Sequence, residues 1–93
     1  MKDDQKKAVA LGYSKEDEAP KVLAKGQGLV AEKIIESAKE NKIPLIKDPE
    51  TVTSLTSIEM GQAIPPELYQ VVANIYTFLI DRDREMERII HEK

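Results

Sequence analysis

The first half of the chain shows the apolar spacing of strands and then that of a helix. In Lys7–Tyr13, Val9 and Leu11 fall on one face with Tyr13, while small residues fill the other face, as in a half-buried strand. A charged turn follows, and Pro20 opens a second short apolar run, Lys21–Lys25. The two runs are predicted to pair as an antiparallel hairpin.

Residues 19–48 then predict strand, glycine turn, helix and strand. Gly26 and Gly28 allow a tight turn, and Leu29–Asn41 places Val30, Ile34 and Ala38 on one helical face. The polar face of this helix holds Glu32, Lys33, Glu36, Lys39 and Glu40. Ile43–Ile46 forms the next apolar run, so we expect a right-handed βαβ crossover between parallel, neighbouring strands.

The second half of the chain is predicted to be helical. Pro49–Met60 is expected to form a short helix capped by Asp48, with Pro49 as its first residue and Gly61 as its terminator. Pro66–His91 gives the longest predicted helix, with an apolar stripe at Leu68, Val71, Val72, Ile75, Phe78 and Leu79. Met86, Ile89 and Ile90 continue this stripe past a charged block, where the last turns would protrude or support self-association.

The overall prediction is an α/β domain with a small mixed sheet of about three strands, one βαβ crossover and three surrounding helices. With 93 residues, the chain fits a single domain over residues 7–93 behind a frayed N-terminus at 1–6. The net charge is −3 and basic residues form no block, which argues against nucleic-acid binding. No apolar run is long enough to insert into a membrane, so a cytoplasmic location is expected.

Two patterns were considered as sites for chemistry. Gly26-Gln27-Gly28-Leu29-Val30-Ala31 fits the dinucleotide fingerprint, with Asp48 at the end of the next strand. A single crossover is too little sheet for such a site, so a simple strand-to-helix turn is favoured. The only histidine, His91, lies near the end of the sequence, and cysteine is absent. No catalytic residue, metal site or cofactor is therefore predicted, and the protein is not expected to be an enzyme.

Several short blocks resemble the cytoplasmic C-terminal domain of the FlhB family, the export-switch proteins of flagellar and related type III secretion systems. The blocks are, in order, Ala8–Leu11, Ala19–Gly26 (Ala-Pro-Lys-Val-Leu-Ala-Lys-Gly), Ile43–Ile46, Glu59–Pro65 (Glu-Met-Gly-Gln-Ala-Ile-Pro) and Glu67–Ala73. Together they cover roughly residues 8 to 80.

The chain departs from the family pattern at two motifs. The family's self-cleaving Asn-Pro-Thr-His precedes the Ala-Val-Ala-Leu block, but Asp3, Asp4, Gln5 and Lys6 stand there in this sequence, so no self-cleavage is expected. The family's Pro-Leu-Ala-Arg-Ala-Leu-Tyr motif is changed to Pro49–Leu55, Pro-Glu-Thr-Val-Thr-Ser-Leu. Family members also carry a transmembrane domain and a strand before the cleavage site, so one edge strand is expected to be missing or replaced.

The resemblance implies a cytoplasmic interaction module, peripheral at the protein export apparatus, that binds export-gate components or exported substrates. Lys25, Gly26, Pro49 and Val52 are the candidate partner-binding residues that the resemblance implies. The alternative is a repurposed peptide-binding or self-associating module that uses the sheet edge exposed by the missing strand.

Overall fold

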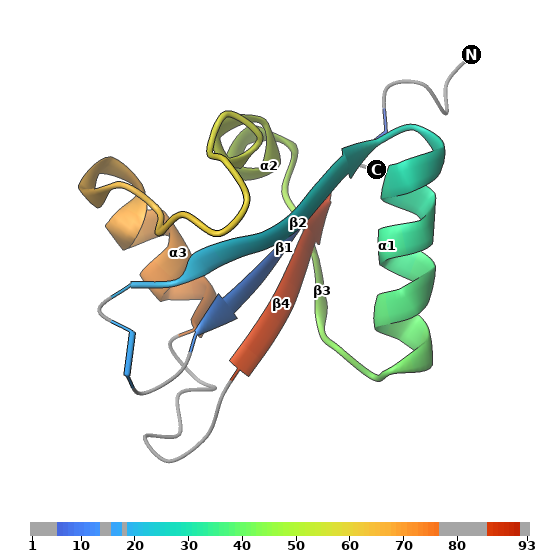
Figure 1. Cartoon of the computed structure of the whole chain (residues 1–93), viewed down its shortest axis with the longest axis horizontal. Coiled ribbons are helices and arrows are strands. Elements are labelled where there is room, and N and C mark those ends of the chain that lie inside the picture. Colours follow the sequence, from blue (N-terminus) through green and yellow to red (C-terminus); the bar gives the residue numbers. More distant parts are fainter. Residues whose placement is uncertain (1–5, 14–15, 18, 77–85, 92–93) are drawn as a thin grey trace.

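A computed structural model describes residues 6–13, 16–17, 19–76 and 86–91. In chain order the elements are β1 (Lys7–Tyr13), β2 (Lys21–Gln27), α1 (Leu29–Glu40), β3 (Leu45–Lys47), α2 (Pro49–Leu55), the 3₁₀ helix η2 (Pro66–Leu68), α3 (Tyr69–Tyr76) and β4 (Met86–His91). The strands form a mixed four-stranded sheet in the order β2-β1-β4-β3. Helix α1 covers one face of this sheet, and α2 and α3 lie against the other (Figure 1). The predicted α/β class is confirmed, with one strand more than expected.

The predicted β1–β2 hairpin is confirmed. The two strands pair antiparallel from Lys7 opposite Gln27 to Gly12 opposite Lys21, with a shift in register between Ala10 and Leu11. Strand β2 extends two residues beyond the predicted end at Lys25, so Gly26 lies inside the strand and not in a turn. Residues that are paired across the two strands point to the same face of the sheet, and this face alternates from one pair to the next.

The prediction of one helix over Pro66–His91 is wrong, because Met86–His91 is an interior strand. β4 pairs antiparallel with β1 along its whole length and parallel with β3. The helical part comprises η2 and α3, which the structure describes as far as Tyr76. Phe78 and Leu79 of the predicted stripe lie outside the described residues; within the stripe, Val72 is buried as expected.

The burial of β4 explains why the strand forms. Adjacent residues of a strand point to opposite faces. Ile90 accordingly joins the core beneath α2 and α3, and Ile89 joins the core beneath α1. One strand therefore closes both apolar layers, which a protruding helix would leave open. Because Ile89 and Ile90 are both buried, the predicted surface for self-association through Met86, Ile89 and Ile90 is wrong.

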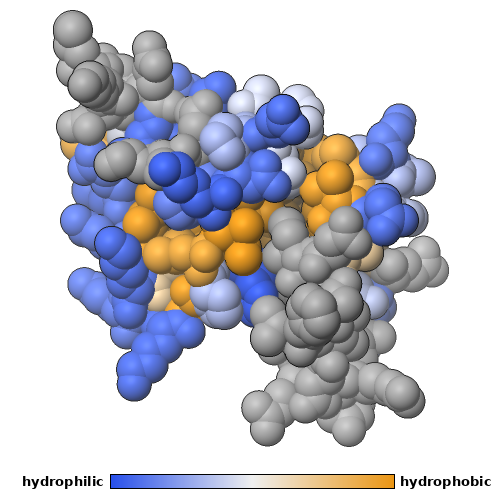
Figure 2. Space-filling model, turned by 180° about the vertical axis from the view of Figure 1, so that it is seen from behind, coloured by the Kyte–Doolittle hydropathy of each residue, from blue (hydrophilic) through white to orange (hydrophobic). Residues whose placement is uncertain are grey.

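The predicted crossover exists, but its strands are not neighbours. The chain leaves β2, passes through α1 and returns in β3, while β1 and β4 lie between these two strands. β3 is a short edge strand of three residues. Figure 2, a view from behind, shows apolar side chains gathered in the middle of that face of the molecule. Around β3, the half-buried Ile43 and Leu45 pack against the core beneath α1, and the half-buried Ile46 packs against the core beneath α2 and α3.

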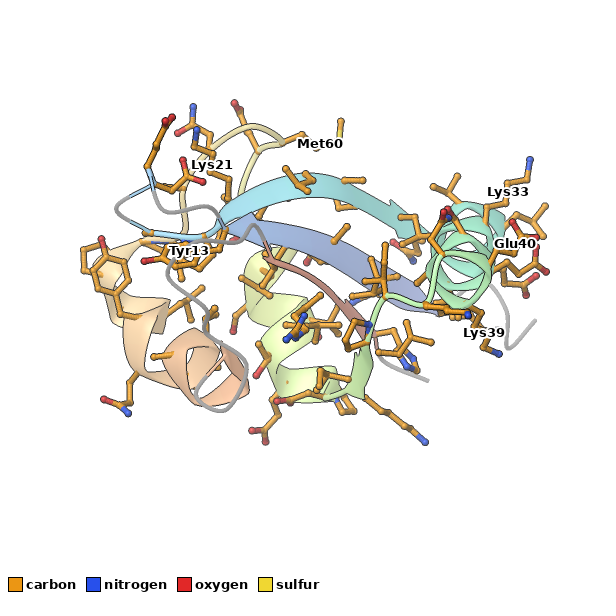
Figure 3. The ribbon with its side chains drawn as sticks, turned by 90° about the horizontal axis from the view of Figure 1, so that it is seen from below. Tyr13, Lys21, Lys33, Lys39, Glu40 and Met60 are labelled. Carbon is orange, nitrogen blue, oxygen red and sulfur yellow. The ribbon has the colours of Figure 1, made fainter. Side chains whose placement is uncertain are left out.

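The two glycines before α1 serve different purposes. Gly28 is the N-cap, with φ 64° and ψ −127°, a conformation that glycine reaches without a Cβ penalty. Its N–H donates to the Lys6 carbonyl at 2.8 Å, so Lys6 is held in place although a frayed N-terminus was predicted to include it. At Gly26, α1 comes so close that an added Cβ would overlap the side chain of Val30. Lys33, Lys39 and Glu40 project from α1 into solvent, as predicted (Figure 3).

The start of α2 agrees with the prediction, but its end does not. The Asp48 carboxylate accepts hydrogen bonds from the Thr51 N–H (3.1 Å) and the Thr51 hydroxyl (2.7 Å), and Pro49 is the first helical residue. The helix ends at Leu55, well before Gly61. Gly61 has φ 88° and donates its N–H to the Val22 carbonyl at 2.7 Å. The segment around residues 61–64 thereby pairs with the first half of the outer edge of β2.

Candidate functional site

A cleft of about 420 Å³ opens where the β1–β2 hairpin meets the end of α2. Lys7, Lys25, Gly26, Gln27 and Thr56 line it. Lys7 is opposite Gln27 and Val9 is opposite Lys25, so both lysines share the sheet face that carries Val9. Since Val9 belongs to the core beneath α2 and α3, this is the face on which α2 lies.

Lys25 holds the end of α2 against the sheet. Its ammonium donates to the Thr56 carbonyl at 2.8 Å and to the Ile58 carbonyl at 2.9 Å. Carbonyls at the end of a helix lack intrahelical partners and carry partial negative charge, so a lysine is favourable there. The half-buried Lys25 side chain thus has a fixed position in the cleft and a structural role as well.

The cleft is positively charged. Lys7 and Lys25 are diagonal neighbours across the hairpin, a spacing of roughly 7–8 Å that long side chains can bridge. None of the lining residues in the described part of the chain carries a carboxylate. The arrangement can therefore offer two ammonium groups to a polar group that enters. The Thr56 hydroxyl beside them already donates to the Thr53 carbonyl at 2.7 Å.

The predicted partner-binding residues do not form one site. Lys25 and Gly26 line the cleft, and Pro49 is exposed at the opposite end of α2. Val52 is fully buried in the core, so its assignment as a surface residue is wrong. Of the residues at the position of the lost cleavage motif, Asp3, Asp4 and Gln5 lie outside the described residues. Lys6 pairs with Glu32 at 3.4 Å.

Sequence reasoning missed Lys7, Gln27 and Thr56. The alternation of side chains along β1 places Lys7 on the same face as Val9. The pairing of the hairpin puts Lys25 opposite Val9, and therefore on that face too. The contribution of Thr56 depends on where α2 ends and on which face it covers, and neither follows from local periodicity.

The residues considered for cofactor chemistry have structural roles here. Asp48, the acidic residue of the apparent dinucleotide fingerprint, caps α2 through Thr51. The Val30 side chain stands against Gly26, where the backbone of such a site would need to be open to a ligand. His91 belongs to β4, opposite Ala8 and Lys47. Within the described ranges, no group of three or more acidic or histidine side chains is placed to hold a metal ion.

In the described part of the chain, no helix is both long enough and apolar enough to span a membrane.

The fold and the cleft together define a small α/β domain with helices on both sheet faces and a basic cleft beside a hairpin. A family model described as the FlhB HrpN YscU SpaS family matches residues 4–79. The chain belongs to this family.

Individual relatives agree with this assignment. The flagellar biosynthetic protein FlhB of Aquifex aeolicus is 38% identical over 81 residues, which are 85% of this chain but 23% of that protein. FlhB of Escherichia coli strain K12 is 42% identical over 74 residues, 77% of this chain and 19% of its own length. The uncharacterized protein YlqH of Bacillus subtilis strain 168 is 37% identical over 83 residues, 88% of this chain and 89% of its own length. The chain thus spans about a fifth to a quarter of the matched FlhB proteins and most of YlqH.

Proposed function

We propose that this domain is an interaction module of a flagellar or related type III protein export apparatus. The family match across residues 4–79 carries the proposal, together with relatives whose names place them in flagellar biosynthesis. The module works at the cytoplasmic side of the apparatus and binds export-gate components or exported proteins. No catalytic step is part of the proposed role.

The proposal includes that the chain does not cut itself. The family cleavage depends on an asparagine that cyclises before a proline, and Asp3, Asp4, Gln5 and Lys6 provide neither residue. Intact mass spectrometry of the purified chain after days at neutral pH should show one uncut species. A cut between Asp3 and Lys6 would contradict this part of the proposal.

Complementation tests the role itself. A motile bacterium whose FlhB is truncated before its cytoplasmic domain would express this chain, and export of hook and filament proteins would be scored. Restored export is the expected result. If export stays absent while the chain is folded and present at normal level, the family assignment stands but the export role does not.

The alternative of a repurposed peptide-binding module loses its main structural support. It required the edge of the sheet that a missing strand would expose. Strand β4 of the same chain pairs with both β1 and β3, so neither of these strands presents an open edge toward the other. The remaining edges are β3, which is three residues long, and β2, whose first half is covered by residues 61–64.

A further inference from the structure

We propose that the cleft between the β1–β2 hairpin and α2 binds a carboxylate side chain of an acidic segment in a partner protein. The inference rests on the proposed function only in assigning the carboxylate to a protein. The chemistry of the site is argued from Lys7, from Lys25 and from the two carbonyls that Lys25 contacts.

The first argument is the geometry of the two lysines. Lys25 spends two of its three N–H groups on the carbonyls of Thr56 and Ile58, which fixes the ammonium and leaves its third donor for a ligand. Lys7 approaches from the neighbouring strand on the same face. A group bound between the two ammonium groups would receive charge-assisted hydrogen bonds, which are stronger than neutral ones.

The second argument is the setting of the cleft, which favours one negative charge over two. Carbonyl oxygens at the end of α2 lie beside the Lys25 ammonium and contribute partial negative charge. A phosphate would bring a second negative charge toward these oxygens. A carboxylate brings one, and Lys7 balances it.

The third argument is room. A volume of about 420 Å³ exceeds what one carboxylate needs, so the neighbouring backbone of an extended peptide can enter with it. An acidic stretch of a polypeptide therefore fits the site in charge and in size.

The test is a titration of the isotopically labelled full chain with a capped tetraglutamate peptide, followed by backbone amide NMR shifts at low salt. Saturable shifts are expected at Lys7, Lys25, Gly26, Gln27 and Thr56. Capped tetraglutamine, which has the same shape without charge, should leave these amides in place. Added salt should weaken the binding, because exposed charges are screened.

Matched variants identify the site. Lys7→Gln removes one ammonium without touching the Lys25 contacts to α2, and should weaken tetraglutamate binding by about threefold or more. Lys33→Gln makes the same charge change on the exposed face of α1, away from α2, and should alter affinity less than about twofold (Figure 3). The amide spectra of both variants verify that they remain folded.

Three results would overturn the inference. They are shifts spread evenly over the lysines of α1, equal weakening by Lys7→Gln and Lys33→Gln, and stronger shifts of the same amides with inorganic phosphate than with tetraglutamate. The complementation experiment is independent of these outcomes. Carboxylate binding without restored export would leave the cleft assignment standing and reject the export role.

Discussion

Replacement of Ile90 by alanine tests the position of β4 in the centre of the sheet. Ile90 is fully buried, opposite Val9 in β1 and Ile46 in β3, and belongs to the core beneath α2 and α3. Truncation of a buried isoleucine to alanine costs about 2–5 kcal/mol, since apolar contacts are lost and a cavity remains. Ile90 is enclosed by strands on both sides, which limits collapse of the cavity. We therefore expect a loss of about 3 kcal/mol in the free energy of unfolding.

Urea denaturation followed by far-ultraviolet circular dichroism measures this loss, because the chain contains no tryptophan to report by fluorescence. A domain of this size has a total stability of roughly 5–14 kcal/mol. The variant should thus unfold at a clearly lower urea concentration with an unchanged slope. The thermal midpoint should fall by roughly 12–24 °C.

Leu29→Ala is the matched control, because leucine and isoleucine lose the same number of carbon atoms on truncation. Leu29 is 71% exposed at the start of α1, so its replacement should cost less than about 0.5 kcal/mol. If Ile90→Ala were as mild as Leu29→Ala, residue 90 would not be buried between β1 and β3. The helical, protruding arrangement that the sequence pattern predicted would then be the better description.

Three further substitutions test the supports of the site. Lys25→Met keeps the aliphatic stem but removes both hydrogen bonds to the end of α2. It should lower the unfolding free energy by about 1–2 kcal/mol in the same urea assay. An unchanged unfolding free energy would mean that the ammonium does not hold α2. Gly26→Ala should cost about 1–3 kcal/mol by overlap with Val30, and the double variant with Val30→Ala should regain part of that loss; additive effects would contradict the overlap. Asp48→Ala should cost about 1 kcal/mol through loss of the α2 cap, while Glu50→Ala, an exposed first-turn control, should cost less in parallel thermal melts.

The local elements that the sequence predicted well are those with a complete local signal. The β1–β2 hairpin follows from alternation and from the turn before Pro20, and α1 follows from its helical period. The α2 cap follows from the Asp-Pro pair at 48–49. Each of these features is decided by residues close together in the chain, so no knowledge of the remaining fold is needed.

The strand β4 could not be predicted in the same way. Arginine, glutamate and methionine favour helix, and the spacing of Met86, Ile89 and Ile90 continues the stripe of the preceding helix. Intrinsic propensity is a weak preference that tertiary context overrides. Here the gap between β1 and β3 offers pairing on both sides, and Ile89 and Ile90 fill the two opposite cores. The adjacent isoleucine pair was the available signal, because a two-sided sheet needs apolar residues on both faces.

Only part of the candidate site could be predicted from the sequence. The family resemblance pointed to Lys25 and Gly26, which line the cleft, but also to Val52, which is buried. The resemblance shows which motif position a residue occupies, but it does not show whether the side chain is exposed. Val52, an aliphatic residue at the family's arginine position, is buried where α2 meets the sheet. To predict that Lys7 lines the cleft, the register of the strands must be known. To predict the same of Thr56, the position at which α2 ends must be known.

The position of β4 bears on which part of the chain constitutes the functional unit. The family match ends at residue 79, but β4 begins at Met86 and lies between two strands within the matched range. A fragment limited to the match would leave the edges of β1 and β3 unpaired and both cores without their isoleucines. β1 carries Lys7 and supports the hairpin that carries Lys25, so the cleft depends on a strand that lies outside the family pattern. The family model therefore identifies the family of this domain, while the integrity of its sheet depends on β4, which lies beyond the residues that the model matches.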